Sequence, residues 1–245
     1  CMAQIEIEYE DGTKDRIVTD DAWKASYGEL READLLMGES HDLAKSMPGW
    51  DAPGFNDNGW APVALTPRAE VKIPVQAYPG DPVRRFETII ARKMTEPKPG
   101  VFVYDLGQNI VGWAKIALDG KAGQKVVVRH AEMLQQDGTL YTVALRSARA
   151  TDYYTLAQDG TVTLEPGFTF HGFRYIEITG VDKAPATDGV RGVVIHSNIP
   201  RTAEFEASNP LLTKLAQNIV WGQKGNYFDV PTDCPQRDER LGWTG

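Results

Sequence analysis

The sequence predicts a mainly β protein, with antiparallel β-sandwich domains followed by one helix and a charged loop. Between Pro82 and Pro200, short alternating or β-branched runs are separated by Asp-Gly pairs, which favour tight turns between strands. No apolar pattern with helical spacing extends beyond a couple of turns in that interval. After Pro200, apolar residues recur at helical spacing from Leu211 to Val220. We therefore expect β-sandwiches first and an α-helical element last.

The first predicted element is a β-hairpin in residues 4–18. Two alternating runs meet there at Asp11-Gly12, a pair that suits turns whose twist matches that of the strands. Because Cys1-Met2 leads at once into a strand, we expect the chain to start within a domain.

Residues 23–67 are rich in turn residues and contain Trp23, Trp50 and Trp60. One interpretation of the run GWDAPGFNDNGW is a sugar-binding face with a tryptophan platform. Its hydroxyl partners or calcium ligands would be Asp51, Asn56, Asp57 or Asn58. The run lacks the acidic spacing of an EF-hand loop, which argues against calcium. The other interpretation, which we favour, is that these tryptophans pack in a core.

A proline-rich passage, residues 67–82, predicts a linker or an edge crossing, because proline cannot donate to a sheet ladder. We place a domain boundary here, between a first domain at residues 1–67 and a β-sandwich at residues 68–200. Strands expected in the sandwich include residues 101–104, 114–118 and 126–128. Turns are expected at Asp119-Gly120, Asp137-Gly138, Asp159-Gly160 and Asp188-Gly189.

The last predicted element is an amphipathic helix. Asn209 can cap it with Pro210 at its first position, and Gly222 and Gly225 end or loosen it. Its apolar stripe consists of Leu211, Leu212, Leu215, Ile219 and Val220. Because one helix cannot bury its own stripe, we expect the stripe to pack against the sandwich or against a partner chain.

Composition limits the partners. The chain has 245 residues, 42% of them hydrophobic, which is enough for a core, and its net charge of −8 argues against nucleic acid. We see no apolar run long enough to span a bilayer and no secretory leader, so we expect no membrane partner. Localisation stays open between cytoplasmic and secreted, and a homo-oligomer stays open too. With only Cys1 and Cys234, no disulfide framework and no zinc site are expected.

Four histidines, His41, His130, His171 and His196, are far apart in the sequence and form no pair at a metal-ligand spacing. Structural roles are favoured over catalysis, since a lone histidine is usually a satisfied polar group. We expect no metal and no cofactor. His171 is expected to brace the interface between the sandwich and the element that follows it.

Residues 226–245, NYFDVPTDCPQRDERLGWTG, are the main candidate for a functional site, because they combine carboxylates, guanidiniums and a tryptophan. The mixture fits sugar cleavage, in which one carboxylic acid protonates the leaving oxygen and a distant carboxylate activates water or attacks the ring. Arginine can hold a carboxylate through paired hydrogen bonds, and tryptophan can pack on a pyranose. A structural loop whose charges merely pair with each other fits the composition about equally well.

The run DVPTDCPQRDERLGWTG resembles the signature at the start of the catalytic domain of bacterial α-L-rhamnosidases, inverting glycoside hydrolases with an (α/α)6 barrel. Upstream motifs resemble the β-sandwich that precedes this barrel: DLGQNIVGW, RHAEML, DGTLY, LRSARATDYYTL and FTFHGFRYIEITG. The resemblance covers nearly the whole chain. It implies that residues 201–245 begin the all-α catalytic domain and that residues 1–67 are part of an N-terminal sandwich, similar in some relatives to a carbohydrate-binding module. Truncation at both ends is expected.

Carried over residue by residue, the resemblance implies that Glu239 is the general acid and that Asp233, Arg237 and Trp243 belong to the rhamnose pocket, with Asp238 a further candidate. The family's general base lies far beyond Gly245, so the chain is expected to be inactive alone, without a closed pocket around Asp233 and Glu239. The implied substrate is a glycoside or polysaccharide with terminal α-L-rhamnose, and the aglycone is not determined. A non-catalytic carbohydrate-binding module and a structural or interaction domain are the other interpretations. The charged signature favours the enzyme.

Overall fold

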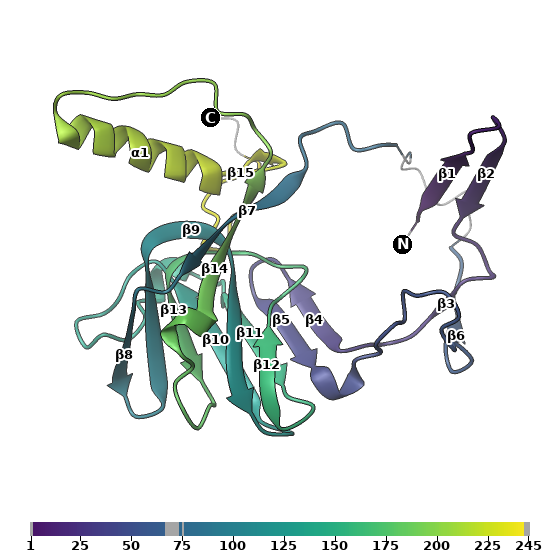
Figure 1. The fold of residues 1–245 in the computed structure, drawn as a ribbon, viewed down its shortest axis with the longest axis horizontal. Helices are drawn as coiled ribbons and strands as arrows, with labels where there is room; N and C mark the ends of the chain where they lie inside the picture. The colour runs from purple at the N-terminus through teal and green to yellow at the C-terminus, as the bar shows by residue number, and fades with distance from the viewer. Residues whose placement is uncertain (1, 67–73, 75, 243–245) are drawn as a thin grey trace. The chain divides into compact units, whose positions relative to one another are not determined.

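Strands make up most of the regular structure, as the sequence predicts (Figure 1). The computed structural model describes residues 2–66, 74 and 76–242. Contacts divide the chain into one unit of residues 1–28 and 47–79 and a second of residues 29–46 and 80–245. The predicted boundary between residues 67 and 68 lies outside the described residues. Among the described residues, no helix is both long enough and apolar enough to cross a membrane.

The first unit contains the predicted hairpin. Strands β1 (Gln4–Glu8) and β2 (Lys14–Val18) pair antiparallel, and Gly12 adopts a φ of 83° in the turn between them. A second small sheet pairs β3 (Lys24–Ala25) with β6 (Ala61–Pro62). The hairpin prediction is therefore confirmed.

The tryptophans of this unit do not lie in a core. Trp50 is 60% exposed and Trp23 is 41% exposed. The rings pack on one another instead: Trp60 lies 6.5 Å from Trp50 and 5.8 Å from Phe55, between ring centroids. No described residue of the unit is buried, because two-stranded sheets are too small to cover an indole on both faces. The core interpretation is wrong for Trp23 and Trp50, and the sugar platform stays a prediction.

The second unit is built on one ten-stranded sheet with the order β4-β5-β11-β10-β13-β9-β14-β7, while β8 and β12 also pair with β9. Neighbouring strands are antiparallel except β5 and β11, which are parallel. The strands are β4 (Leu30–Asp34), β5 (Gly38–Asp42), β7 (Val83–Ile90), β8 (Lys93–Lys98), β9 (Val101–Gly120), β10 (Lys125–Ala131), β11 (Thr151–Thr155), β12 (Gly160–Leu164), β13 (His171–Thr179) and β14 (Val190–Ser197). Short 3-10 turns are η1 (Leu43–Lys45), η3 (Val143–Leu145) and η4 (Thr187–Gly189).

Strand β9 joins the layers of the sandwich. Its first part pairs with β8 and β13, and its last part pairs with β14 and β12, so the sheet curls around the core (Figure 1). Residues 101–104 and 114–118, predicted as separate short strands, belong to one continuous strand, so that prediction is wrong. Gly107, with a φ of 73°, and Gly112, with a φ of 153°, let the chain bend without ending the strand. A Cβ at Gly112 would come within 1.8 Å of the Val193 carbonyl oxygen, so only glycine fits there.

The curled sheet encloses one main core. Its largest fully buried apolar side chains include Tyr104, Leu106, Ile116, Phe173, Ile176 and Ile178. Each apolar side chain removed from water stabilises the fold by roughly 1.5–3 kcal/mol. Tyr104 also donates its hydroxyl to the Pro185 carbonyl at 2.6 Å, which satisfies a polar group that would otherwise be buried alone.

Helix α1 (Pro210–Gly225) begins and ends as the sequence predicts. The Asn209 side chain accepts a hydrogen bond from the Leu211 N–H, and Pro210 occupies the first turn. The C-terminal end of the helix contacts the sheet. There Trp221 packs against the core, and a Cβ at Gly225 would come within 2.8 Å of Val111 Cγ2.

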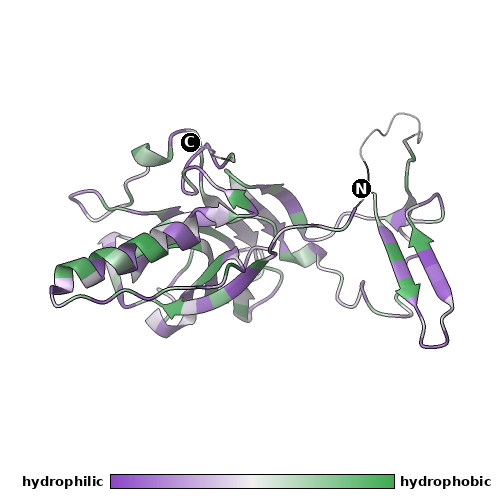
Figure 2. Cartoon of the chain, turned by 90° about the horizontal axis from the view of Figure 1, so that it is seen from above, coloured by the Kyte–Doolittle hydropathy of each residue, from purple (hydrophilic) through white to green (hydrophobic). Residues whose placement is uncertain are grey.

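The apolar stripe of α1 is mostly uncovered. Leu211, Leu215 and Ile219 are 75%, 53% and 60% exposed. The alternative in which the sandwich covers the stripe is therefore wrong for these three residues, and cover by a partner chain stays a prediction. The reason is geometric: the helix contacts the sheet near its C-terminal end, and its N-terminal turns extend past the edge of the sheet (Figure 1). Figure 2 shows apolar residues recurring along the helix.

Candidate active site

The charged loop, which we define as residues 229–242, follows α1 and β15 (Tyr227–Phe228), and it includes the short strand β16 (Val230–Pro231). Its two arms meet at the base, where the Asp233 N–H donates to the Leu241 carbonyl at 3.0 Å and the Arg240 N–H donates to the Asp233 carbonyl at 2.8 Å. Thr232 and Gly242 form an isolated bridge across the same base. The charged residues between these arms are therefore held in one closed loop.

Backbone strain is concentrated in and beside this loop. In the described part of the chain, five residues other than glycine have a positive φ: Arg146, Ala150, Asp229, Cys234 and Arg240. Three of them belong to the charged loop, and Arg146 contacts it. Such conformations cost energy and cluster at functional sites, so their position supports a functional role for the loop.

Glu239 is held by two guanidinium groups. Arg237 donates from Nε at 2.9 Å and from Nη2 at 2.7 Å to Glu239 Oε2, and Arg146 donates from Nη1 to Oε1 at 2.7 Å. The Cys234 thiol, then the Arg237 fork and then Arg146 lower the pKa of Glu239 to about 2. In this arrangement Glu239 is an ionised carboxylate.

Asp238 faces the sandwich. Its Oδ2 accepts from the Ser147 hydroxyl at 2.6 Å and from the Ser147 N–H at 3.3 Å, and Oδ1 lies 3.2 Å from Arg146 Nε as an ion pair without hydrogen-bond alignment. The Ser147 hydroxyl and then its N–H hold the pKa of Asp238 below its ordinary value. The side chain therefore attaches the charged loop to the sandwich.

Asp233 accepts a hydrogen bond from the Cys234 thiol at 2.9 Å, and burial followed by this bond raises the pKa of the thiol to about 12. Asp233 also lines an open hollow of about 420 Å³ between the loop and α1, together with Asn218, Trp221 and Gln236. Glu239 is not among the residues that line this hollow. In the described structure Asp233 and Glu239 therefore do not both line this hollow, and the absence of a closed pocket around them stays a prediction.

Arg240 anchors the loop to Phe170, the residue directly before β13. Its Nη1 donates to the Phe170 carbonyl at 2.7 Å, and the guanidinium lies 4.9 Å from the centroid of the Phe170 ring. Burial lowers the pKa of Arg240 to about 10. Arginine on an aromatic face is well suited to such a docking contact.

The fold brings together four of the five candidate residues, since Asp233, Arg237, Asp238 and Glu239 all lie in the charged loop. Trp243 lies outside the described residues. Sequence reasoning missed Arg146 and Ser147, which reach the loop from the sandwich. Their only sequence signal is that they lie in the run LRSARATDYYTL, which resembles a family motif.

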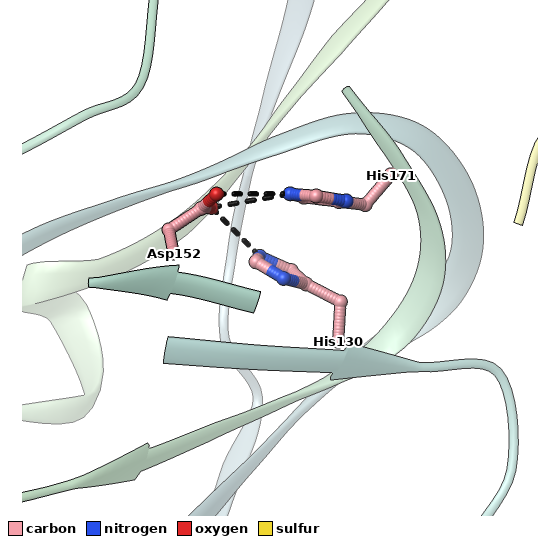
Figure 3. A group of neighbouring side chains, drawn as sticks. All are labelled: His130, Asp152 and His171. Carbon is pink, nitrogen blue, oxygen red and sulfur yellow. Dashed lines mark hydrogen bonds and ion pairs between the residues drawn. The ribbon is translucent and has the colours of Figure 1, made fainter. Parts of the chain in front are cut away.

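A second polar cluster lies inside the sandwich, where His130, Asp152 and His171 are fully or almost fully buried (Figure 3). His171 Nε2 lies 3.2 Å from both carboxylate oxygens of Asp152, and the two imidazole rings stack with centroids 4.2 Å apart. His130 Nδ1 contacts the Ala150 carbonyl at 3.0 Å. These bonds pair the Asp152 carboxylate and one nitrogen of each ring. Among the described residues, His130 Nε2 and His171 Nδ1 are buried without a hydrogen-bond partner, and the donor types could also hold a metal ion.

This cluster changes two expectations about the histidines. The fold pairs His130 and His171, which the sequence shows as isolated residues. His171 points to Asp152 rather than to the charged loop, and its neighbour Gly172 contacts that loop at Gln236 instead. The expected bracing role of His171 is therefore wrong.

Comparisons with known proteins agree with the motifs in the sequence. Residues 1–87 match the α-L-rhamnosidase N-terminal domain, residues 95–196 the bacterial α-L-rhamnosidase concanavalin-like domain, and residues 200–245 the bacterial α-L-rhamnosidase 6 hairpin glycosidase domain. An α-L-rhamnosidase of Streptomyces avermitilis is 53% identical over 246 residues, which are 100% of this chain and 24% of that protein. The chain spans about a quarter of the length of such relatives.

Solved structures give the same result. The crystal structure of Streptomyces avermitilis α-L-rhamnosidase complexed with L-rhamnose superposes with a TM-score of 0.93 at 52% identity, over 99% of this chain and 24% of that one. The α-L-rhamnosidase from Dictyoglumus thermophilum superposes with a TM-score of 0.91 at 42% identity, over 99% of this chain and 27% of that one. With three domain models matched in order along the sequence, the chain belongs to the bacterial α-L-rhamnosidase family.

Proposed function

We propose that this chain is part of an inverting α-L-rhamnosidase and that it supplies the general acid, Glu239. The observation that carries the proposal is the charged loop. A carboxylate oxygen of Asp233 lies within 4.8 Å of one of Glu239, and Arg237 donates hydrogen bonds to Glu239. The loop lies in the region that matches the glycosidase domain. Sugar cleavage needs such a carboxyl at the leaving oxygen.

Each residue of the loop has a separate role in this proposal. Glu239 protonates the glycosidic oxygen, while a carboxylate outside this chain, roughly 6.5–9.5 Å away, activates water on the opposite face of the sugar. Asp233, Arg237 and Trp243 hold the rhamnose through its hydroxyls and one ring face. Asp238 lies beside the pocket and attaches the charged loop to the sandwich, because its carboxylate contacts Ser147 and Arg146.

The ionised state of Glu239 sets a condition on this mechanism. A carboxyl whose pKa is about 2 carries no proton near neutral pH, whereas a general acid needs a raised pKa. Rhamnose hydroxyls offer Arg237 alternative acceptors. We infer that sugar binding draws Arg237 away from Glu239, so that the carboxyl takes up a proton before it acts.

The substrate proposed is a glycoside or polysaccharide that ends in α-L-rhamnose. In the proposed domain plan, residues 201–245 begin the catalytic domain, residues 68–200 form the sandwich before it, and residues 1–67 belong to an N-terminal sandwich. The match of three family models along the chain supports the order of the domains, whereas the first model extends to residue 87, past the proposed boundary at residue 67.

The test compares the 245-residue chain with the product of the same reading frame continued past Gly245. The chain alone should release no rhamnose from an aryl α-L-rhamnoside above the buffer rate, because the proposed base is not in it. The longer protein should cleave the substrate, and Glu239→Gln should abolish the cleavage. Glu204→Gln is the matched control, since Glu204 is exposed and lies outside the loop.

Two results would contradict the proposal. A stop codon directly after Gly245 would favour a binding module over an enzyme. Unchanged turnover in the Glu239→Gln variant of the longer protein would remove Glu239 from the role of general acid.

A further inference from the structure

The residue Arg146 stands on a firmly anchored part of the sandwich. It follows the 3-10 turn η3, and its N–H donates to the Val143 carbonyl at 3.2 Å. The neighbouring side chains Leu145, Ala148 and Ala150 are buried and form a small apolar cluster with Leu36. The base of Arg146 therefore belongs to the sandwich, although its side chain is half exposed.

From this base Arg146 contacts two carboxylates of the charged loop at once. Its Nη1 donates to Glu239 Oε1 at 2.7 Å, and its Nε lies 3.2 Å from Asp238 Oδ1. Ser147, the next residue, holds the other oxygen of Asp238 at 2.6 Å. The contacts join residues 93 and 91 positions apart in the sequence, so they connect two regions that match different family models.

The two oxygens of Glu239 have different partners. Arg146 donates to Oε1, whereas Arg237, which belongs to the charged loop, donates to Oε2 from two nitrogens. Loss of Arg237 would leave Oε1 fixed to the sandwich. Loss of Arg146 would leave Glu239 attached only to its own loop, which could then move with it.

Arg146 also adopts a φ of 58°, an unfavourable conformation for a residue with a side chain. A glycine or asparagine would adopt this backbone at lower cost. A glycine at this position would lack the guanidinium that contacts both Glu239 and Asp238.

We propose that Arg146 is a positioning residue through which the concanavalin-like sandwich orients Glu239, so that the carboxyl keeps its place when Arg237 turns to the sugar. The inference rests on the proposed function of Glu239 as general acid. In this inference two domains build the site: the charged loop supplies Glu239, and the sandwich orients Glu239 through Arg146.

Electrostatics gives the measurable consequence. The groups that face Glu239 are Cys234, Arg237 and Arg146, with Asp233 and Asp238 nearby. Cys234, Arg237 and Arg146 lower its pKa. Removal of Arg146 should raise the pKa of Glu239, because an adjacent opposite charge favours the ionised form.

The test follows the Glu239 carboxyl carbon by NMR in the 245-residue chain, from about pH 3 to about pH 7, and compares Arg146→Gln, Arg146→Lys and Arg149→Gln. In the wild-type chain we expect no inflection in this range. Arg146→Gln should raise the pKa of Glu239 by about 1 and bring an inflection into view. Arg146→Lys should restore part of the effect, since it keeps the charge and loses the two-carboxylate geometry.

Arg149→Gln is the matched control. Arg149 is an exposed arginine three positions along the same segment, and its guanidinium lies over Tyr153 at 6.0 Å instead of contacting the loop. It should leave the Glu239 titration unchanged. If Arg146→Gln titrates like the wild-type chain, or if Arg149→Gln produces the same shift, the proposal is wrong.

Two measurements guard against misinterpretation. Thermal melting of each variant shows whether it folds. If Arg146→Gln does not fold, the Glu239 titration of Arg146→Lys tests the proposal instead. Hydrogen exchange at the Arg240 amide, which bonds to the Asp233 carbonyl, reports loop closure and should accelerate in Arg146→Gln. Neither readout needs rhamnosidase activity, so failure of this inference and failure of the proposed function are distinguishable.

Discussion

Gly172, on strand β13, lies so close to Gln236 of the charged loop that a Cβ atom added at position 172 would be 2.8 Å from Gln236 Cβ and 3.0 Å from its Cα. Atoms of neighbouring residues do not approach this closely, so only glycine permits the loop to rest on the strand. The position of the candidate site thus depends on a missing side chain in the sandwich.

Gly172→Ala should therefore displace the loop. We expect a loss of about 1–3 kcal/mol in the free energy of unfolding, because the clash involves backbone atoms that cannot simply rotate away. Urea unfolding gives the magnitude, and proteolysis within residues 229–242 should become faster. Gly167→Ala is the control, since a Cβ there meets nothing within 4 Å. Equal stability of the two variants would show that the loop does not rest on Gly172.

The pair between Arg174 on β13 and Asp105 on β9 should contribute measurably to stability. Arg174 donates from Nε at 2.7 Å and from Nη2 at 2.8 Å to the two oxygens of Asp105. Because both side chains are partly exposed, we expect Arg174→Gln to lower the free energy of unfolding by on the order of 1 kcal/mol. Lys121→Gln, which breaks the highly exposed pair with Asp182, should change nothing measurable.

The sign of the pH dependence follows from the same pair. Arg174 holds the pKa of Asp105 below its ordinary value in the folded protein. The folded state then binds fewer protons than the unfolded state, so the stabilisation is present above the ordinary pKa of 3.8 and is lost as the pH falls through the folded-state pKa. The difference between wild type and Arg174→Gln should shrink in this acid range, and a constant difference would contradict the assignment.

His130 should stay neutral throughout the physiological range. Burial is the main cause that lowers its pKa from 6.5 to about 3, with His171 adding to it. The imidazole resonance of His130 should show no inflection near pH 6.5 in an NMR titration. As the unfolded state takes up a proton first, stability should fall as the pH drops below 6.5, by at most about 1.4 kcal/mol per pH unit from this residue. An ordinary titration would mean that the cluster is not closed to water.

The uncovered stripe of α1 should contribute little to the stability of this chain. Leu215→Gln should change the free energy of unfolding by less than about 0.5 kcal/mol, since Leu215 is 53% exposed. Trp221→Ala, at the end that packs against the core, should cost on the order of 2 kcal/mol. If Leu215→Gln destabilises the chain as much as Trp221→Ala, the stripe is covered in solution, and sedimentation at several concentrations would identify a second copy as the cover.

The sequence alone predicted the features that depend on neighbouring residues. The hairpin turn needs Asp11-Gly12, and the start of α1 needs Asn209 and Pro210; both are local, so they can be recognised before the fold is known. The β-rich pattern and the family signature belong to the same class. The candidate residues of the charged loop were found for that reason, because they follow one another in the chain.

Tertiary structure decided every relationship between distant segments. The sequence shows Arg146 and Glu239 as charges 93 positions apart, and it shows His130 and His171 as isolated histidines. Only the tertiary fold brings each pair together. Strands β10 and β13, which carry the two histidines, pair in the curled sheet, and the charged loop docks beside η3, where Arg146 meets Glu239. The same holds for the exposure of Leu215, which depends on where the helix meets the sheet. Local propensity selects the elements, whereas long-range packing determines which side chains meet and which remain in water.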